Sequence, residues 1–275
     1  MSSLSQAQRH LASKGYPIGN SMAPYIEEWL GWYMGANKFY NYKERVDSRT
    51  FKFERKTLHP ARFVCTSWAS LLFNESTGII SEDSKANEWL DNYLKMTSFL
   101  AKGQGLVESG FALGTSAWSL RFENIAETGL KSPMAKVFVQ RHEAREIIPL
   151  TYNEDELQEV AFVSNVVVKG EKLVQLAIHE LIDTGYRISI MMFSDKGQVI
   201  TGNEAVIETK SSIPLFGLIR PAIDNIYDPI TPMGRSIFDD AIDCIQMVDM
   251  AWDNMHKDIY LGQAYVVYIR HPARP

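Results

Sequence analysis

The hydrophobic periodicity of the chain changes near residue 115, and this change limits the possible folds more than any other feature. Before it, residues 22–35, 59–76 and 83–105 place apolar side chains every three or four positions, which is typical of amphipathic helices. Gly35 is expected to end the first of them and Pro60 to lie near the start of the second. The side chains expected in the core from the second segment are Phe63, Val64, Trp68, Leu71 and Leu72. After it, residues 115–200 mostly alternate apolar and polar side chains between turn signals at 169–170, 184–185 and 196–197, which indicates an antiparallel strand meander. Residues 236–261 return to the helical period. The sequence therefore predicts an α+β fold with N-terminal helices, an antiparallel β meander and a long C-terminal helix.

The C-terminal helix is the most distinctive predicted element. Ser236 followed by Asp239 matches a capping pattern, and Gly262 is expected to end the helix. At about 1.5 Å per residue the predicted span is about 39 Å long. Its predicted apolar stripe consists of Phe238, Ala241, Ile242, Ile245, Val248, Trp252, Met255 and Ile259. The simplest interpretation is an amphipathic helix that packs on its own domain.

Two polar residues interrupt this apolar stripe. Asp249 and His256 fall within or beside it on a helical wheel, whereas Asp253 falls on the opposite side. A buried carboxyl group needs a hydrogen-bonding partner. Asp249 is therefore expected to have a partner either in its own chain or in a neighbouring subunit.

Composition excludes several classes of protein. The chain has 275 residues, a hydrophobic content of 45% and a net charge of −5, which is the profile of a packed globular protein and argues against tight binding of nucleic acid. No apolar run reaches the roughly 20 residues of a membrane span, and no signal peptide is evident. A soluble, intracellular protein is expected. Cys65 and Cys244 are expected to be buried thiols.

The familiar catalytic signatures are absent or broken. The motifs HEARE and HELID, which begin at His142 and His179, resemble the start of a zinc-protease pattern, but Glu146 and Asp183 stand where a second histidine is required. Both histidines are expected on strands. No catalytic, cofactor-binding or metal-binding residue is therefore predicted.

Two further motifs have simple structural interpretations. The glycine-containing segment 102–110 lacks the spacing of a dinucleotide or phosphate loop, so it is interpreted as a turn between helices. The acidic pair Asp239 and Asp240 is interpreted as part of a solvated acidic surface. Neither motif predicts a reaction.

Several segments, taken in order, resemble portal proteins of tailed bacteriophages, in the branch common among phages of Gram-positive bacteria. The matching segments are WLGWYMG (29–35), RKTLHPARFVCTSWASLLFNES (55–76), GFALGTSAWSLRF (110–122), AIHELIDTGYRISIMMF (177–193) and, above all, PLFGLIRPAIDNIYDPITPMGRSIFDDAIDCIQMVDMAWDNMHKDIYLGQAYVVY (214–268). Portal proteins of this family form dodecameric rings at one capsid vertex. DNA passes through the ring during packaging and ejection, driven by a separate terminase ATPase.

The resemblance implies a division of the chain into three parts. Residues 1–114 correspond to the helical part of the portal wing, residues 115–230 to its antiparallel β-rich part, and residues 231–275 to a stem-like helix and the start of the following segment. The later clip, the second stem helix and the crown are not expected in this sequence. The candidate residues at a subunit seam or near the channel are Asp249, Trp252, Asp253 and His256.

The resemblance also implies partners and a location. The expected partners are further copies of the chain, the terminase, scaffold or capsid proteins, head-completion proteins and, transiently, double-stranded DNA, with no membrane and no cofactor. The expected location is the virion, with assembly in the host cytoplasm. Two alternatives stay open: a monomeric protein-binding module with one exposed apolar patch, and a metal-dependent hydrolase or nuclease whose Asp and His residues converge from at least three elements.

Overall fold

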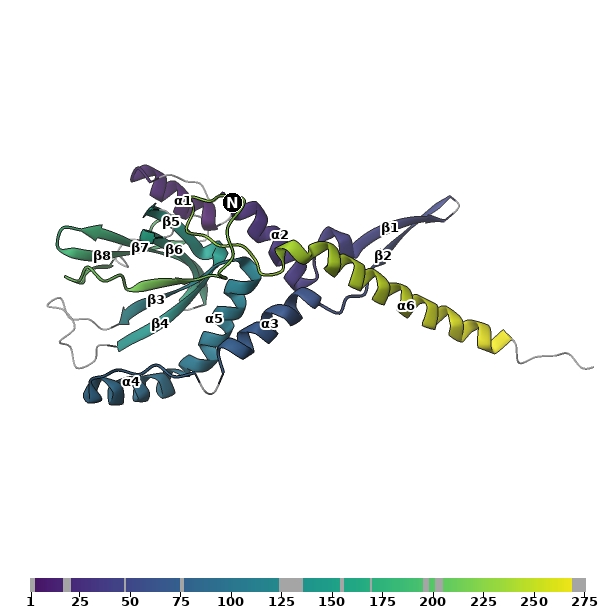
Figure 1. Ribbon diagram of the computed structural model, residues 1–275. Coiled ribbons are helices and arrows are strands. Elements are labelled where there is room, and N and C mark those ends of the chain that lie inside the picture. Colours follow the sequence, from purple (N-terminus) through teal and green to yellow (C-terminus); the bar gives the residue numbers. More distant parts are fainter. Residues whose placement is uncertain are drawn as a thin grey trace, which may run out of the picture.

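The chain forms a body of sheets and helices from which one long helix and one hairpin project. The computed structural model describes residues 3–16, 21–46, 48–74, 77–123, 136–153, 156–168, 170–194, 198–200 and 205–268. Helix α6 (Ile242–Tyr268) and the hairpin formed by β1 (Asn41–Val46) and β2 (Arg49–Glu54) extend away from the body on the same side (Figure 1). The predicted α+β fold, with N-terminal helices, an antiparallel meander and a C-terminal helix, is confirmed. No described helix is long and apolar enough to cross a membrane.

The N-terminal helices begin and end at signals in the sequence. Pro60 occupies the first turn of its helix, and the Asp83 carboxyl group accepts a hydrogen bond of 2.8 Å from the Ala86 amide to cap the next one. Gly35, with φ of 67°, ends the second helix in the left-handed conformation that glycine tolerates. The helices are α1 (Ser3–Ser13), α2 (Ala23–Met34), α3 (Pro60–Leu72), α4 (Ser84–Thr97) and α5 (Phe99–Leu113), and short 3-10 turns are η1 (Lys38–Tyr40), η2 (Ala144–Glu146) and η3 (Asp239–Ala241).

Two antiparallel sheets form the centre of the body. One sheet follows the order of the sequence and contains β5 (Ile147–Asn153), β6 (Glu156–Val168), β7 (Glu171–Ile182), β8 (Gly185–Ser194) and β9 (Ala205–Glu208). The other has the order β10 (Phe216–Ile219), β3 (Ser116–Glu123), β4 (Lys136–Glu143). The predicted turn at Thr184 and Gly185 joins β7 to β8, whereas residue 169 and residues 195–197, in the other two predicted turns, lie outside the described residues.

Aromatic and histidine rings fill the space between the two sheets. His142 of β4 stacks on Phe162 of β6 with a centroid distance of 4.1 Å. His179 of β7 meets Phe162 and Phe216 edge to face, at 5.5 and 5.4 Å. The opposite face of the larger sheet packs against Leu11 of α1. Both histidines lie on strands, as predicted.

The N-terminal part is less helical than the sequence analysis suggested. Residues 41–46 and 49–54 form the two strands of the β1–β2 hairpin, in which the rings of Tyr42 and Phe53 lie on opposite strands with a centroid distance of 5.5 Å. The alternation of Tyr42, Phe51 and Phe53 with charged residues is the period of a strand. This short signal was missed between two long helical segments.

The interpretation of residues 102–110 as a turn was wrong, because they lie inside α5. The glycines are needed for close packing rather than for a turn. A Cβ atom on Gly103 would lie 2.3 Å from the Phe73 ring, and one on Gly105 would lie 2.7 Å from the Arg141 guanidinium. Helix α5 thus passes close to α3 and to β4.

The ends of the C-terminal helix also differ from the prediction. The Ser236 hydroxyl donates to the Phe111 carbonyl at 3.1 Å instead of capping the helix, and η3 precedes the start of α6 at Ile242. The helix continues past Gly262 to Tyr268, so 27 residues give a length of about 40 Å. Asp239 is not solvated: it accepts hydrogen bonds from Trp29 Nε1 at 2.7 Å and from the Tyr227 hydroxyl at 2.9 Å. Its neighbour Asp240 is exposed.

The predicted core face of α3 is exposed. The buried side chains of this helix are Ala61, Cys65 and Ala69, because only small residues fit against its neighbours. The predicted core residues Phe63, Val64, Trp68, Leu71 and Leu72 face outward, and Phe63 is 72% exposed. Cys65 is buried as expected, whereas Cys244 on α6 is exposed. A contiguous group of large apolar side chains on a surface is a feature of interaction sites and ligand-binding grooves.

Candidate functional site

Asp249 anchors α6 to the body. Its side chain is fully buried, and its carboxyl oxygens accept hydrogen bonds from the Tyr40 hydroxyl at 2.7 Å, the Thr57 hydroxyl at 2.8 Å and the Leu58 amide at 2.9 Å. Burial and the hydrogen bond to Asp249 raise the pKa of Tyr40, so the hydroxyl remains a donor. The partner predicted for Asp249 is therefore in the same chain, supplied by two hydroxyl groups and an amide.

Asp253 forms a second anchor one turn further along α6. It accepts from the Lys56 amide at 3.1 Å and pairs with Lys257 at 3.0 Å. Burial alone would raise the pKa of Asp253, but these two partners stabilise the carboxylate and hold the pKa below its usual range. Asp253 had been assigned to the polar side of the helix, yet it is buried.

The other two candidate residues are placed differently. Trp252 is partly exposed and His256 is exposed. Between and around the anchors, α6 presents apolar side chains to the outside: Met247, Val248, Met250, Met255, Ile259 and Tyr260. Much of the predicted apolar stripe therefore faces outward while two aspartates face inward. The expectation that this stripe packs on its own domain was wrong for Val248, Met255 and Ile259.

A groove continues the apolar surface beside α3. It has a volume of about 590 Å³ and lies between α3, α5 and the chain that follows β10. Its lining includes Trp68, Leu72, Phe111, Ile223 and Ile237. Trp68 and Leu72 also belong to the exposed face of α3, so the groove and the helix face form one apolar region.

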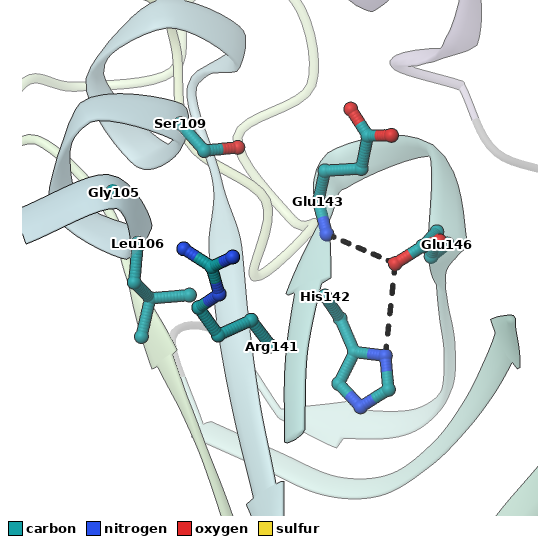
Figure 2. Close-up of a pocket in the computed structure, with 7 residues that line it drawn as sticks. All are labelled: Gly105, Leu106, Ser109, Arg141, His142, Glu143 and Glu146. Carbon is teal, nitrogen blue, oxygen red and sulfur yellow. Dashed lines mark hydrogen bonds and ion pairs between the residues drawn. The ribbon is translucent and has the colours of Figure 1, made fainter. Parts of the chain in front are cut away.

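A smaller and more polar pocket lies where α5 faces β4. Figure 2 shows Ser109 of α5 opposite Arg141, His142 and the two glutamates Glu143 and Glu146. Its volume is about 270 Å³. The Glu146 carboxylate accepts from the Glu143 amide at 3.2 Å and lies 3.8 Å from His142 Nδ1 (Figure 2).

His142 also has the partners of a catalytic histidine, but the serine among them has no space beside it for a substrate. Its Nε2 lies 2.8 Å from the Ser119 hydroxyl, and Glu146 approaches its other nitrogen, so the residue types match a serine–histidine–acid triad. The Ser119 side chain is buried between the sheets, beside a cavity of about 20 Å³ that would hold about one water molecule. A nucleophile must reach a substrate carbonyl. We therefore interpret this arrangement as a polar bridge between the sheets.

Metal ligands do not converge in the part of the chain that the structure describes. No group of three or more His, Cys, Asp or Glu side chains there is placed to hold a metal ion. Comparison with known protein families and with curated proteins finds no match to the chain. A function for this chain therefore has to be inferred from its own surfaces.

The contacts of α6 identify residues that the sequence analysis missed. Tyr40, Lys56, Thr57 and Leu58 hold the two aspartates, and all of them flank the hairpin. Their contacts join segments about two hundred positions apart. A single sequence contains no signal for a pairing of that range, although the buried Asp249 did indicate that some partner exists.

The stability of the chain should depend on pH through His179. Burial, and secondarily the neighbouring His142, lower the pKa of His179 from its usual 6.5 to about 4. Between these values the unfolded chain binds more protons than the folded chain, so the stability present above pH 6.5 is lost as the pH falls toward 4. The expected loss approaches about 3 kcal/mol. Urea denaturation at several pH values measures it.

The substitution His179→Phe provides the critical comparison. A phenyl ring fits the edge-to-face cluster of Phe162 and Phe216 and has no proton to gain. In this variant the free energy of unfolding should fall much less between pH 6.5 and 4 than in the parent chain. In His256→Phe, on the exposed side of α6, it should fall as much as in the parent. If the free energy of unfolding of His179→Phe falls as much as that of the parent, groups other than His179 cause the pH dependence.

Proposed function

We propose that this chain is a structural portal subunit of a tailed phage, part of the ring at a capsid vertex through which DNA is packaged and ejected. The observation that carries the proposal is the exposure of large apolar side chains along α6 and on α3. A helix that projects from its body and exposes Val248, Met255 and Ile259 needs an apolar partner. In a ring, that partner is a neighbouring copy of the chain.

The fold and the sequence resemblance support the same assignment. An α+β body with a long projecting helix is what a wing followed by a stem helix requires. The segments that resemble portal proteins include residues 55–76, which contain the exposed face of α3, and residues 214–268, which contain α6. The two apolar surfaces thus lie in the two segments that carry much of the resemblance.

The anchors of α6 fit the role of a rigid stem. Asp249 and Asp253 fix the start of the helix to the body, while its outer surface stays free for contacts between subunits. Trp252 and His256, which are not part of the anchors, remain candidates for the seam or the channel. In this proposal the terminase, scaffold or capsid proteins, head-completion proteins and transient DNA are partners of the ring, and the virion is its location.

The proposal predicts weak self-association that depends on the outer face of α6. Sedimentation velocity over a range of concentrations should show oligomers at high concentration, because contacts between ring subunits are individually modest. The double substitution Val248→Glu with Met255→Glu buries two charges in that contact. It should weaken association at least about tenfold, the equivalent of about 1.4 kcal/mol.

The matched control is Asn254→Glu with Asn87→Glu, which adds the same charge at an exposed polar position of α6 and at a polar position of α4. The control should associate like the parent chain. A parent chain that stays strictly monomeric at high concentration would contradict the assembly role and favour the alternative of a monomeric binding module. That alternative rests on the same exposed surface and on the groove beside α3.

A further inference from the structure

One face of the β1–β2 hairpin carries three exposed cations. Lys43 of β1 lies directly opposite Lys52 of β2, and Arg45, two residues further along β1, shares their face. All three side chains are exposed. Within the described part of the chain, none of the three forms an ion pair. Glu54 is the one acidic residue on the same face, so three cations stand against one acid there. We call this surface the hairpin cation face (Lys43, Arg45 and Lys52).

The other face of the hairpin explains why this one is free. Tyr42 and Phe53 lie on that other face, where the Lys257 ammonium of α6 lies 4.9 Å from the centroid of the Tyr42 ring. The hairpin thus turns its aromatic face toward α6, and the hairpin cation face points away from it. Figure 1 shows the hairpin diverging from α6 at the edge of the molecule.

The register of the hairpin places like charges against each other. Two lysines directly opposite across a strand pair repel and destabilise the hairpin. Glu54 lies on the same face, but within the described residues neither lysine forms an ion pair with it or with another acid. An anion from outside the chain would relieve the repulsion.

We propose that the hairpin cation face binds the phosphate backbone of nucleic acid. The face consists of Asn41, Lys43, Arg45, Thr50, Lys52 and Glu54 and has no apolar residue. A stable protein interface needs an apolar centre, whereas neutralisation of phosphates by Lys and Arg does not. Such contacts carry no sequence information and are weakened by salt, so DNA can slide past them.

The identity of the nucleic acid as phage DNA rests on the proposed function. In the proposed ring, the DNA that is packaged and ejected would be the nucleic acid that the hairpin binds. The binding itself depends only on the hairpin, so the two proposals are tested separately.

The experiment compares two double variants that change the net charge equally. Lys43→Glu with Lys52→Glu reverses the hairpin cation face, and Lys85→Glu with Lys95→Glu reverses two exposed lysines of α4. Fluorescence anisotropy with a short labelled DNA duplex at low salt should show at least about a tenfold loss of affinity for the hairpin variant only. The slope of log affinity against log salt concentration should fall by about 2, one phosphate contact for each lysine.

A single substitution separates lost binding from lost folding. Lys52→Glu places opposite charges across the hairpin, so its melting temperature should equal or exceed that of the parent while its affinity for the duplex falls. Equal affinities of the hairpin and α4 variants, or no binding of the parent at low salt, would overturn the inference. Competition by polyglutamate as effective as by DNA at equal charge would also overturn it, in favour of an acidic protein partner. If the chain self-associates but fails these binding tests, the proposed function stands and only the nucleic-acid site on the hairpin is ruled out.

Discussion

Replacing Asp249 with alanine should lower the free energy of unfolding by about 3–5 kcal/mol, because it leaves buried donors without an acceptor. The Tyr40 and Thr57 hydroxyls and the Leu58 amide all donate to this one carboxyl group. A hydroxyl can rotate toward another acceptor, but the Leu58 amide is fixed by the backbone. Chemical denaturation measured by circular dichroism gives the change in unfolding free energy.

Two further substitutions define the cause of that loss. Asp249→Asn keeps the shape, and its amide nitrogen can donate to the two hydroxyl oxygens, so it should cost less than Asp249→Ala. Asp258→Ala removes an exposed acid from the same helix and should change stability by no more than about 0.5 kcal/mol. If Asp249→Ala leaves the stability unchanged and instead weakens self-association, Asp249 belongs to a subunit seam and not to an internal anchor.

The sequence predicted the architecture well, because long periodic segments dominate it. The alternation in residues 115–200 correctly predicted the meander of β6, β7 and β8. Pro60 and Gly35 correctly predicted helix ends. These signals are local, because each depends only on a residue and its neighbours within about one helical turn or one strand.

The sequence could not predict which side of each helix is buried. The amphipathic faces of α3 and α6 are real, but on both helices much of the apolar face is exposed and small or acidic residues face inward. Periodicity identifies a face and assumes that the apolar one is internal. That assumption would fail for a face that binds another molecule, so the exposed apolar faces of α3 and α6 are the main support for the proposed assembly.

The candidate site was predicted only in part, for the same reason. Asp249 was identified because an acid within an apolar stripe needs a partner. The nature of the partner depends on Tyr40 and Thr57, which a different part of the chain brings into place. Asp253 was misplaced because a helical wheel does not show that the segment after the hairpin crosses that side of α6.

Replacing Gly114 with alanine should destabilise the chain by roughly 2–5 kcal/mol, because two costs coincide at this residue. Gly114 has φ of 79°, a conformation that strains any residue with a side chain. A Cβ atom there would also lie 2.5 Å from the Gly234 carbonyl oxygen, which belongs to the backbone and has little room to move. Urea denaturation of the variant and the parent measures the combined effect.

Gly170→Ala is the matched control, because Gly170 has φ of 87° and open space around its Cβ position. It should show only the backbone cost of about 1–2 kcal/mol. If the two variants lose equal amounts of unfolding free energy, the backbone at Gly234 can move away from the added Cβ atom of residue 114 without destabilising the fold. The contact bears on the proposed assembly because the Gly234 amide donates to the Thr115 hydroxyl at 2.8 Å, which fixes the end of α5 against the chain that leads into α6. Gly114→Ala should therefore also weaken self-association beyond its effect on stability, since α6 can present its outer face to a neighbour only if its direction is fixed.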